Sequence, residues 1–237
     1  IKFGEKMAAK YADEVIVLSQ NVQQYFLDTY GRRTYFIPNG IDRPQIREVQ
    51  EIREKYGLCK DGYILFLARL VPEKGLHYLI DAYESIKTDK KLVIAGGSSH
   101  SYAYMRHIQE RAAKNPKIIM TDFVQGRVLE ELYSNAYLFV LPSDVEGMAL
   151  TLLEAMSYGN CCVVSDISEN MEVVEERAVS FKKSNVRDLK EKLWDLLKNP
   201  EKVEDYKRQS ADFICGKYNW DEVVRQTREL YESVNGK

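Results

Sequence analysis

The sequence contains few cysteines and histidines and has no excess of either charge sign. Its 237 residues include four cysteines and three histidines, in no spacing typical of a zinc site or a disulfide framework. With 34 basic and 36 acidic residues the formal net charge is −2, which gives no electrostatic case for a nucleic-acid partner. Because the cysteines form no disulfide framework, we expect a protein of a reducing compartment, the cytoplasm.

Long apolar runs are also missing. None approaches the roughly 20 residues that a membrane-spanning helix requires, so we expect no transmembrane segment. The chain begins Ile1-Lys2-Phe3, which is neither a methionine start nor a signal peptide. We expect it to be a fragment or a processed product of a longer protein.

What is present is a regular alternation of short apolar runs and helical patterns. Strands are predicted at 15–18, 35–37, 63–68, 92–95, 118–121, 137–141, 161–164 and 179–181. Helices are predicted at 21–30, 45–56, 76–86, 102–114, 130–134, after Gly147, and at 185–198, 202–215 and 221–234. This alternation predicts an α/β fold, a doubly wound parallel Rossmann-like sheet with helices on both faces.

The most informative stretch runs from the predicted strand 137–141 through Gly147 into a helix. A helix N-terminus offers unpaired N–H groups and a positive dipole end, which suit a phosphate. The amides expected there belong to Gly147, Met148, Ala149, Leu150 and Thr151. Glu146 and Glu154 are good acceptors for hydroxyl groups, so the stretch predicts a ligand with a phosphate and several hydroxyls. Alternatively, Glu146 is solvated and Glu154 caps the helix.

Further candidate residues follow other predicted strands. Arg69 and Lys74 come after strand 63–68, where a guanidinium fork and an ammonium can clamp a diphosphate; alternatively, they belong to a solvated basic loop. Gly97 follows strand 92–95, and Phe123 and Val124 follow strand 118–121. Right-handed crossovers place such loops at one edge of a parallel sheet, so we expect these residues to converge on one crevice.

Seven residues separate Glu146 from Glu154; Gly147 follows the first glutamate, Ala155-Met156 follows the second, and Pro142-Ser143 precedes both. This motif resembles the signature of retaining glycosyltransferases with the GT-B fold, family 4, the group 1 glycosyltransferases. The resemblance implies that Glu146 faces the transferred sugar, Glu154 holds the ribose, Arg69 and Lys74 bind the donor phosphates, and the loop at Phe123–Val124 meets the nucleobase. The sequence departs from the family at Asp122 and at Ser168-Glu169, where relatives usually carry glycine.

The resemblance also predicts the domain organisation. Residues 1–33 would be a remnant of an N-terminal acceptor domain, 34–216 the nucleotide-sugar donor-binding domain, and 217–237 a helix crossing back toward the missing domain. That domain would receive an acceptor sugar, lipid or small molecule, so the isolated chain would be an inactive part of a hexosyltransferase. The full-length enzyme would be cytoplasmic, either free or peripheral on the inner face of the membrane.

No cofactor is expected, and no metal ion, because cationic side chains would bind the diphosphate and the chain contains no Asp-x-Asp triplet. The donor base is left open between UDP- and GDP-sugars. Three other functions remain open: a non-catalytic nucleotide-sugar-binding subunit or pseudoenzyme, a nucleotide-sugar epimerase on the same fold, and an interaction scaffold without a ligand.

Overall fold

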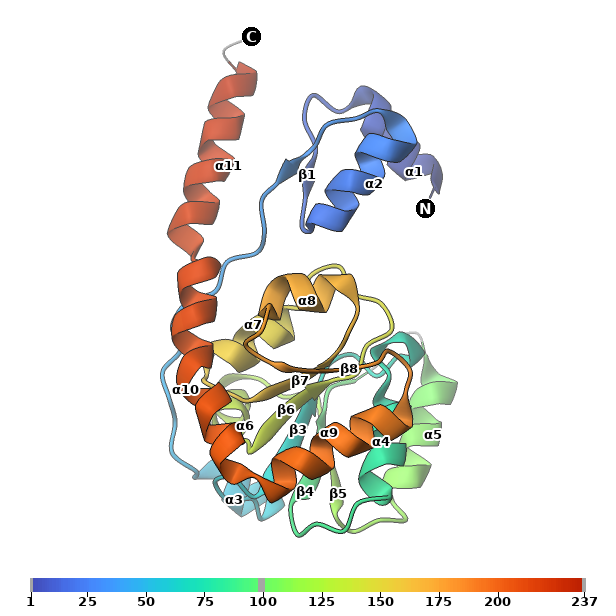
Figure 1. Ribbon diagram of the computed structural model, residues 1–237, viewed down its shortest axis with the longest axis vertical. Coiled ribbons are helices and arrows are strands. Elements are labelled where there is room, and N and C mark those ends of the chain that lie inside the picture. The colour runs from blue at the N-terminus through green and yellow to red at the C-terminus, as the bar shows by residue number, and fades with distance from the viewer. Residues whose placement is uncertain (1, 98–100, 236–237) are drawn as a thin grey trace. The chain divides into compact units, whose positions relative to one another are not determined.

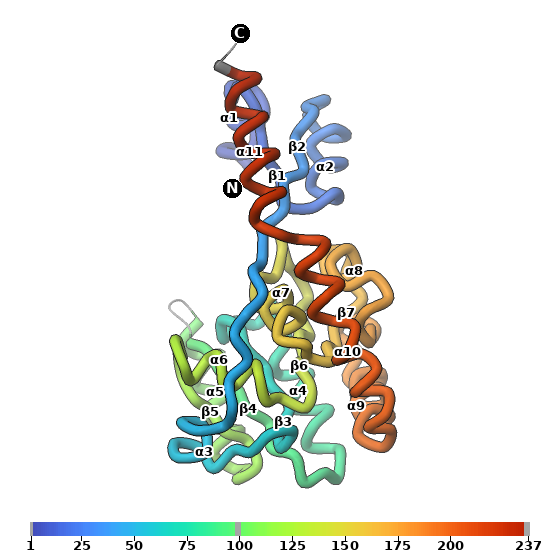
Figure 2. Tube along the Cα trace, turned by 90° about the vertical axis from the view of Figure 1, so that its left-hand side faces the viewer, coloured from blue at the N-terminus to red at the C-terminus, as the bar shows by residue number. Residues whose placement is uncertain are grey.

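The computed structural model describes residues 2–97 and 101–235, and they form two compact units (Figure 1). The larger unit comprises Arg43–Ile214, and the smaller one combines the two ends of the chain, up to Asp42 and from Cys215 onward. Figure 2 traces the chain as it leaves the smaller unit near Asp42 and returns to it near Cys215, inside helix α10 (Pro200–Lys217). Within the described residues, no helix is long and apolar enough to cross a membrane.

The larger unit is built on a six-stranded parallel sheet with the strand order β5-β4-β3-β6-β7-β8. The strands are β3 (Tyr63–Leu67), β4 (Lys91–Ala95), β5 (Ile118–Asp122), β6 (Leu138–Leu141), β7 (Cys162–Ser165) and β8 (Val179–Phe181). Strand order reverses between β3 and β6, which pair in parallel although three helices separate them along the chain. The predicted doubly wound sheet is confirmed, and its switch point lies where such sheets bind ligands.

Helices cover both faces of this sheet (Figure 1). They are α3 (Glu51–Tyr56), α4 (Leu76–Glu84), α5 (Tyr102–Ala112), α6 (Gly126–Asn135), α7 (Leu150–Ser157), α8 (Ser168–Val174), α9 (Val186–Lys198) and α10, with a 3-10 turn at Pro72–Lys74. Strands β6 and β7 are buried along their whole length, as their continuous apolar runs predict for a sheet covered on two sides.

Two predicted segments differ from the structure. The helix predicted at 45–56 forms only over Glu51–Tyr56, because residues before it bond to α6 instead: the Arg47 N–H donates to Ser134 Oγ at 3.0 Å. The loop predicted after strand 161–164 contains α8, whose Asn170 is buried and donates to the carbonyl of Ser165 at 3.2 Å. Both before α3 and at α8, hydrogen bonds between distant segments determine a conformation that the local sequence pattern did not predict.

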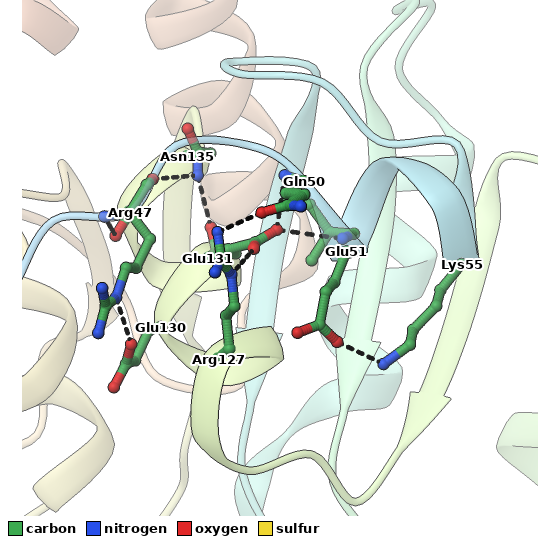
Figure 3. Close-up of polar contacts among 10 residues, drawn as sticks. Arg47, Gln50, Glu51, Lys55, Arg127, Glu130, Glu131 and Asn135 are labelled. Atoms are coloured by element: carbon green, nitrogen blue, oxygen red, sulfur yellow. Dashed lines mark hydrogen bonds and ion pairs between the residues drawn. The ribbon is translucent and has the colours of Figure 1, made fainter.

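A buried carboxylate, Glu131 of α6, holds the start of α3 (Figure 3). Its Oε2 accepts the N–H groups of Gln50 and Ile52 at 2.8 and 3.2 Å, and its Oε1 accepts Arg127 Nε at 2.9 Å. Burial would raise the pKa of Glu131, but the hydrogen bonds from Arg127 and the backbone outweigh it and lower the pKa to about 2. The ionised carboxylate therefore serves as the N-terminal cap that α3 lacks in its own sequence.

The smaller unit contains α1 (Lys2–Tyr11), β1 (Ile16–Val17), α2 (Gln20–Tyr30), β2 (Tyr35–Phe36) and α11 (Trp220–Asn235). Ser19 caps α2, accepting the Val22 N–H at 3.3 Å. The strand predicted at 35–37 is present as β2 and pairs in parallel with β1. The amides of Tyr35 and Ile37 donate to carbonyls in the β1 segment, so residues up to Asp42 pack in the smaller unit.

Candidate functional site

A pocket of about 510 Å³ opens at the carboxyl ends of β3, β4 and β5. Five residues predicted from sequence line it: Arg69, Gly97, Phe123, Val124 and Thr151. The remaining lining residues were not predicted, and most are apolar: Leu67, Ala68, Gly96, Gln125 and Leu129. The predicted convergence of loops from separate strands is therefore seen directly. Phe123 leaves 75% of its surface exposed, so an aromatic face is available to a planar group.

The floor of this pocket depends on a close approach of two backbones. Gly96 has φ +133°, and a Cβ there would lie 2.0 Å from the carbonyl oxygen of Ala68. The Leu70 N–H donates to the carbonyl of Gly97 at 2.9 Å and joins the same two loops. Within this turn Gly96 is the residue that requires glycine, because a Cβ on Gly97 would meet no atom of the described residues within 4 Å.

Lys74 and Glu146 form an ion pair across the switch point. Lys74 Nζ donates to both carboxylate oxygens of Glu146 at 2.6 Å, and Ser143 Oγ donates to Glu146 Oε1 at 2.6 Å. The side chains of Lys74 and Glu146 are only 14% and 4% exposed. The alternative of a solvated Glu146 is therefore wrong, and the solvated-loop alternative is wrong for Lys74, whereas Arg69 is exposed. No sequence pattern indicates that Lys74 and Glu146 bond each other, or that Ser143 joins them.

The turn after β6 leads into α7 as predicted, but the helix begins at Leu150, with Ala149 as its N-cap. Of the five amides that the sequence places at the helix start, only those of Leu150 and Thr151 belong to helical residues. Gly147 is exposed, and a Cβ there would meet nothing within 4 Å. No protein atom therefore demands glycine at this position, and the space beside it is open.

Glu154, in the middle of α7, accepts the hydroxyl of Tyr133 on Oε2 at 2.8 Å. Burial raises the pKa of Glu154, and the Tyr133 hydrogen bond offsets part of this rise. Tyr133 in turn stacks on Tyr158, with ring centroids 5.2 Å apart. The alternative in which Glu154 caps its helix is wrong, because no side chain caps α7 and the carboxylate bonds to α6. Glu154 is not among the residues that line the pocket, but it lies on the same helix as Thr151, which is, one turn further along.

The raised pKa of Glu154 predicts a pH-dependent gain in stability from Glu154→Gln. The folded state binds the Glu154 proton more tightly than the unfolded state, so the carboxyl disfavours folding once the pH rises through the folded pKa. We expect the variant to melt a few degrees higher than the wild type at pH 7, and the difference to vanish as the pH falls below about 4.5. Glu110→Gln, at an exposed position on α5, is the matched control in a thermal melt. Equal shifts for the two variants would contradict this reading.

Gly75 fixes the Lys74 segment against the end of β6. It has φ +66°, and a Cβ there would lie 1.9 Å from the carbonyl oxygen of Pro142. Gly75→Ala should therefore lower the free energy of unfolding by about 1–3 kcal/mol more than a Gly→Ala substitution whose only penalty is the positive φ. Gly57→Ala is that control, since Gly57 has φ +60° and a Cβ there would meet only the flexible end of Lys91, with Nζ at 3.6 Å. Urea unfolding of both variants measures the difference, and equal losses would mean that the two segments do not approach closely.

Residues 48–232 match the model of the family described as Glycosyl transferases group 1. An uncharacterised glycosyltransferase of Methanocaldococcus jannaschii is 29% identical over 92% of this chain and 60% of its own length. Alpha-maltose-1-phosphate synthase of Mycolicibacterium smegmatis is 24% identical over 98% of this chain and 66% of its own length. Anabaena HepE, solved in complex with UDP-glucose, superposes with a TM-score of 0.87 at 19% identity, over 98% of this chain and 67% of that chain.

The parallel sheet, its switch point and these structural neighbours define a doubly wound α/β domain of the type found in GT-B glycosyltransferases. The family match covers most of the chain. The protein belongs to the glycosyl transferases group 1 family, and it spans about 60% of the length of the M. jannaschii relative.

Proposed function

We propose that the chain is the donor-binding half of a retaining, family 4 glycosyltransferase that moves a hexosyl group from a UDP- or GDP-sugar to a hydroxyl acceptor. One observation carries the proposal. Residues predicted independently from four strand-to-helix loops line one pocket, and the Lys74–Glu146 pair and Glu154 lie on the segments that border it. The UDP and UDP-glucose complexes of Anabaena HepE, a protein of the same fold, support a nucleotide-sugar ligand.

Arg69 and Lys74 would bind the diphosphate, where negative charge grows as the sugar departs. Preorganised donors at such a position are often the largest catalytic contribution, worth roughly 3–4 kcal/mol for one group. The amides at the start of α7, including those of Leu150 and Thr151, would add to this field. Phosphate oxygens would compete with Glu146 for the Lys74 ammonium, and the carboxylate, released from Lys74, could then accept hydroxyls of the donor sugar.

Glu154 would accept hydroxyls of the ribose, and its neighbour Tyr133 holds the carboxylate in place for that task. The base would enter the pocket beside Phe123 and Val124, near Gly97. We propose that no cofactor or metal ion is needed, since Arg69 and Lys74 supply the positive charge.

The rest of the enzyme would lie outside this chain. We propose that residues 34–216 bind the donor, while 1–33 and 217–237 belong with an N-terminal acceptor domain. The chain alone would then bind a nucleotide sugar without transferring the sugar. A sugar, a lipid or a small molecule would be the acceptor, and the full-length enzyme would act in the cytoplasm or on the inner face of the membrane.

Sugar transfer by the full-length protein tests this proposal. UDP- and GDP-sugars are offered with a panel of hydroxyl acceptors, with and without EDTA, and NMR reports the anomeric configuration of the product. We expect transfer with retention that EDTA does not abolish. An inverted product would contradict the retaining mechanism, and loss of activity with EDTA would contradict metal independence. Tight binding without transfer would favour the non-catalytic subunit, and epimerised free donor would favour the epimerase.

A further inference from the structure

Asp144 lies two residues before Glu146, and it bonds to three segments outside its own loop. Its Oδ2 accepts the hydroxyl of Tyr78 at 3.1 Å, and its Oδ1 accepts Ser184 Oγ at 2.6 Å. Its N–H donates to the carbonyl of Glu73 at 2.8 Å. Neither the motif nor the pocket includes this residue, and its side chain is only half-buried.

Two of these partners flank Lys74 in the sequence. Glu73 precedes it in the 3-10 turn, and Tyr78 lies in the first turn of α4, so Asp144 ties the Glu146 loop to the segment that carries the cation. The third partner, Ser184, has φ +57°, a left-handed conformation that is rarely adopted by residues other than glycine. A strained backbone persists only where the surrounding structure holds it, so the Ser184 hydroxyl that donates to Asp144 is held firmly in place.

The importance of Asp144 follows from what a bound donor would do to the Lys74–Glu146 pair. A diphosphate that takes the Lys74 ammonium leaves Glu146 with the Ser143 hydroxyl as its remaining side-chain partner among the described contacts. The hydrogen bonds of Asp144 involve none of the groups assigned to the donor, so they persist. The hydrogen bonds of the Asp144 side chain would then hold the Glu146 loop in place against the phosphate-binding segment.

We propose that Asp144 is a positioning residue for the donor sugar, acting through Glu146 without touching the ligand. The inference rests on the proposed function. Reacting groups must be held to within a fraction of an ångström, and a displacement of about 1 Å can cost on the order of 100-fold in rate. Loss of Asp144 should therefore impair recognition of the sugar while leaving recognition of the nucleotide diphosphate nearly unchanged.

The test compares matched ligands on the 237-residue chain by titration calorimetry: UDP with UDP-glucose, and GDP with GDP-mannose. For whichever of these two ligand pairs the wild type binds, Asp144→Ala should lower the affinity for the sugar nucleotide about tenfold relative to the affinity for the nucleoside diphosphate. The affinity for the nucleoside diphosphate should change less than about threefold. Asp144→Asn, which keeps one carbonyl acceptor, should recover most of the ratio. Asp89→Ala, at an exposed position before β4, should leave both affinities unchanged.

Single-contact variants keep the test decisive should Asp144→Ala fold poorly. Tyr78→Phe and Ser184→Ala each remove one of the two hydroxyls, so each should shift the ratio partway in the same direction. An unchanged ratio in these variants, or equal losses for both ligands, would overturn the role of Asp144. A wild-type chain that binds none of the four ligands would instead refute the proposed function, which separates the two failures.

Discussion

Replacing Arg69 and Lys74 together with alanine should erase the preference of the chain for a nucleoside diphosphate over the corresponding nucleoside. Hydrogen bonds to charged groups contribute roughly 1.5–3 kcal/mol each, so losing two should weaken diphosphate binding by about 10²- to 10⁴-fold. Nucleoside affinity should stay the same, because base and ribose would contact Phe123 and Glu154 instead. Titration calorimetry with UDP and uridine, and with GDP and guanosine, measures both quantities.

The two cations differ in what their loss does to the fold. Lys74→Ala leaves the carboxylate of Glu146 buried without its partner, so Glu146→Gln is added to separate lost binding from lost stability. Among the described residues, none forms a hydrogen bond or ion pair with the exposed Arg69 side chain, so Arg69→Ala alone reports on the ligand. Arg53→Ala, on α3 before β3, is the matched control. A double variant that still prefers the diphosphate would show that the cationic clamp is wrong.

Glu131→Ala should lower the free energy of unfolding of the larger unit by about 3 kcal/mol at pH 7. The pKa of Glu131 falls from 4.5 to about 2 on folding, and each pKa unit corresponds to about 1.4 kcal/mol. Because the folded pKa is lowered, this stabilisation is present above about pH 4.5 and is lost as the pH falls toward 2. Urea unfolding at pH 7 and at pH 3 should show a large difference between wild type and variant at pH 7 and a smaller one at pH 3.

The neighbouring residue provides the control for this substitution (Figure 3). Glu130 also forms an ion pair, with Arg47 at 2.6 Å, but both side chains are about one-third exposed. Pairs of this kind contribute at most about 1 kcal/mol, so Glu130→Ala should cost far less than Glu131→Ala. Similar losses for the two variants would mean that capping of α3 by Glu131 does not stabilise the fold.

The sheet and the pocket could be predicted because both depend on patterns local to each strand. Continuous apolar runs such as Leu138–Leu141 are typical of strands buried on two sides, and parallel connections bring the loops after them to one edge. As expected, Arg69, Phe123 and Thr151 line one pocket, although the first and the last are 82 positions apart in the sequence.

The features that could not be predicted are contacts between segments that are distant in the sequence. Lys74 and Glu146 were each assigned to a separate part of the ligand, and nothing in the sequence indicates that one ammonium bonds both carboxylate oxygens. The close approach of the Gly96 and Ala68 backbones joins the loops after β4 and β3, and no local sequence pattern specifies it. Likewise, Glu131 shortened the helix predicted at 45–56 by offering backbone amides a partner from α6.

We propose that Arg69, Lys74, Glu154 and the pocket beside Phe123 surround a single nucleoside diphosphate. A crystal structure of the 237-residue chain with UDP or GDP bound tests it most directly. We expect phosphate oxygens within about 3 Å of the Arg69 guanidinium and the Lys74 ammonium, ribose hydroxyls on Glu154, and the base against Phe123. A nucleotide bound elsewhere on the larger unit, or a Lys74–Glu146 pair left intact beneath a bound diphosphate, would contradict it.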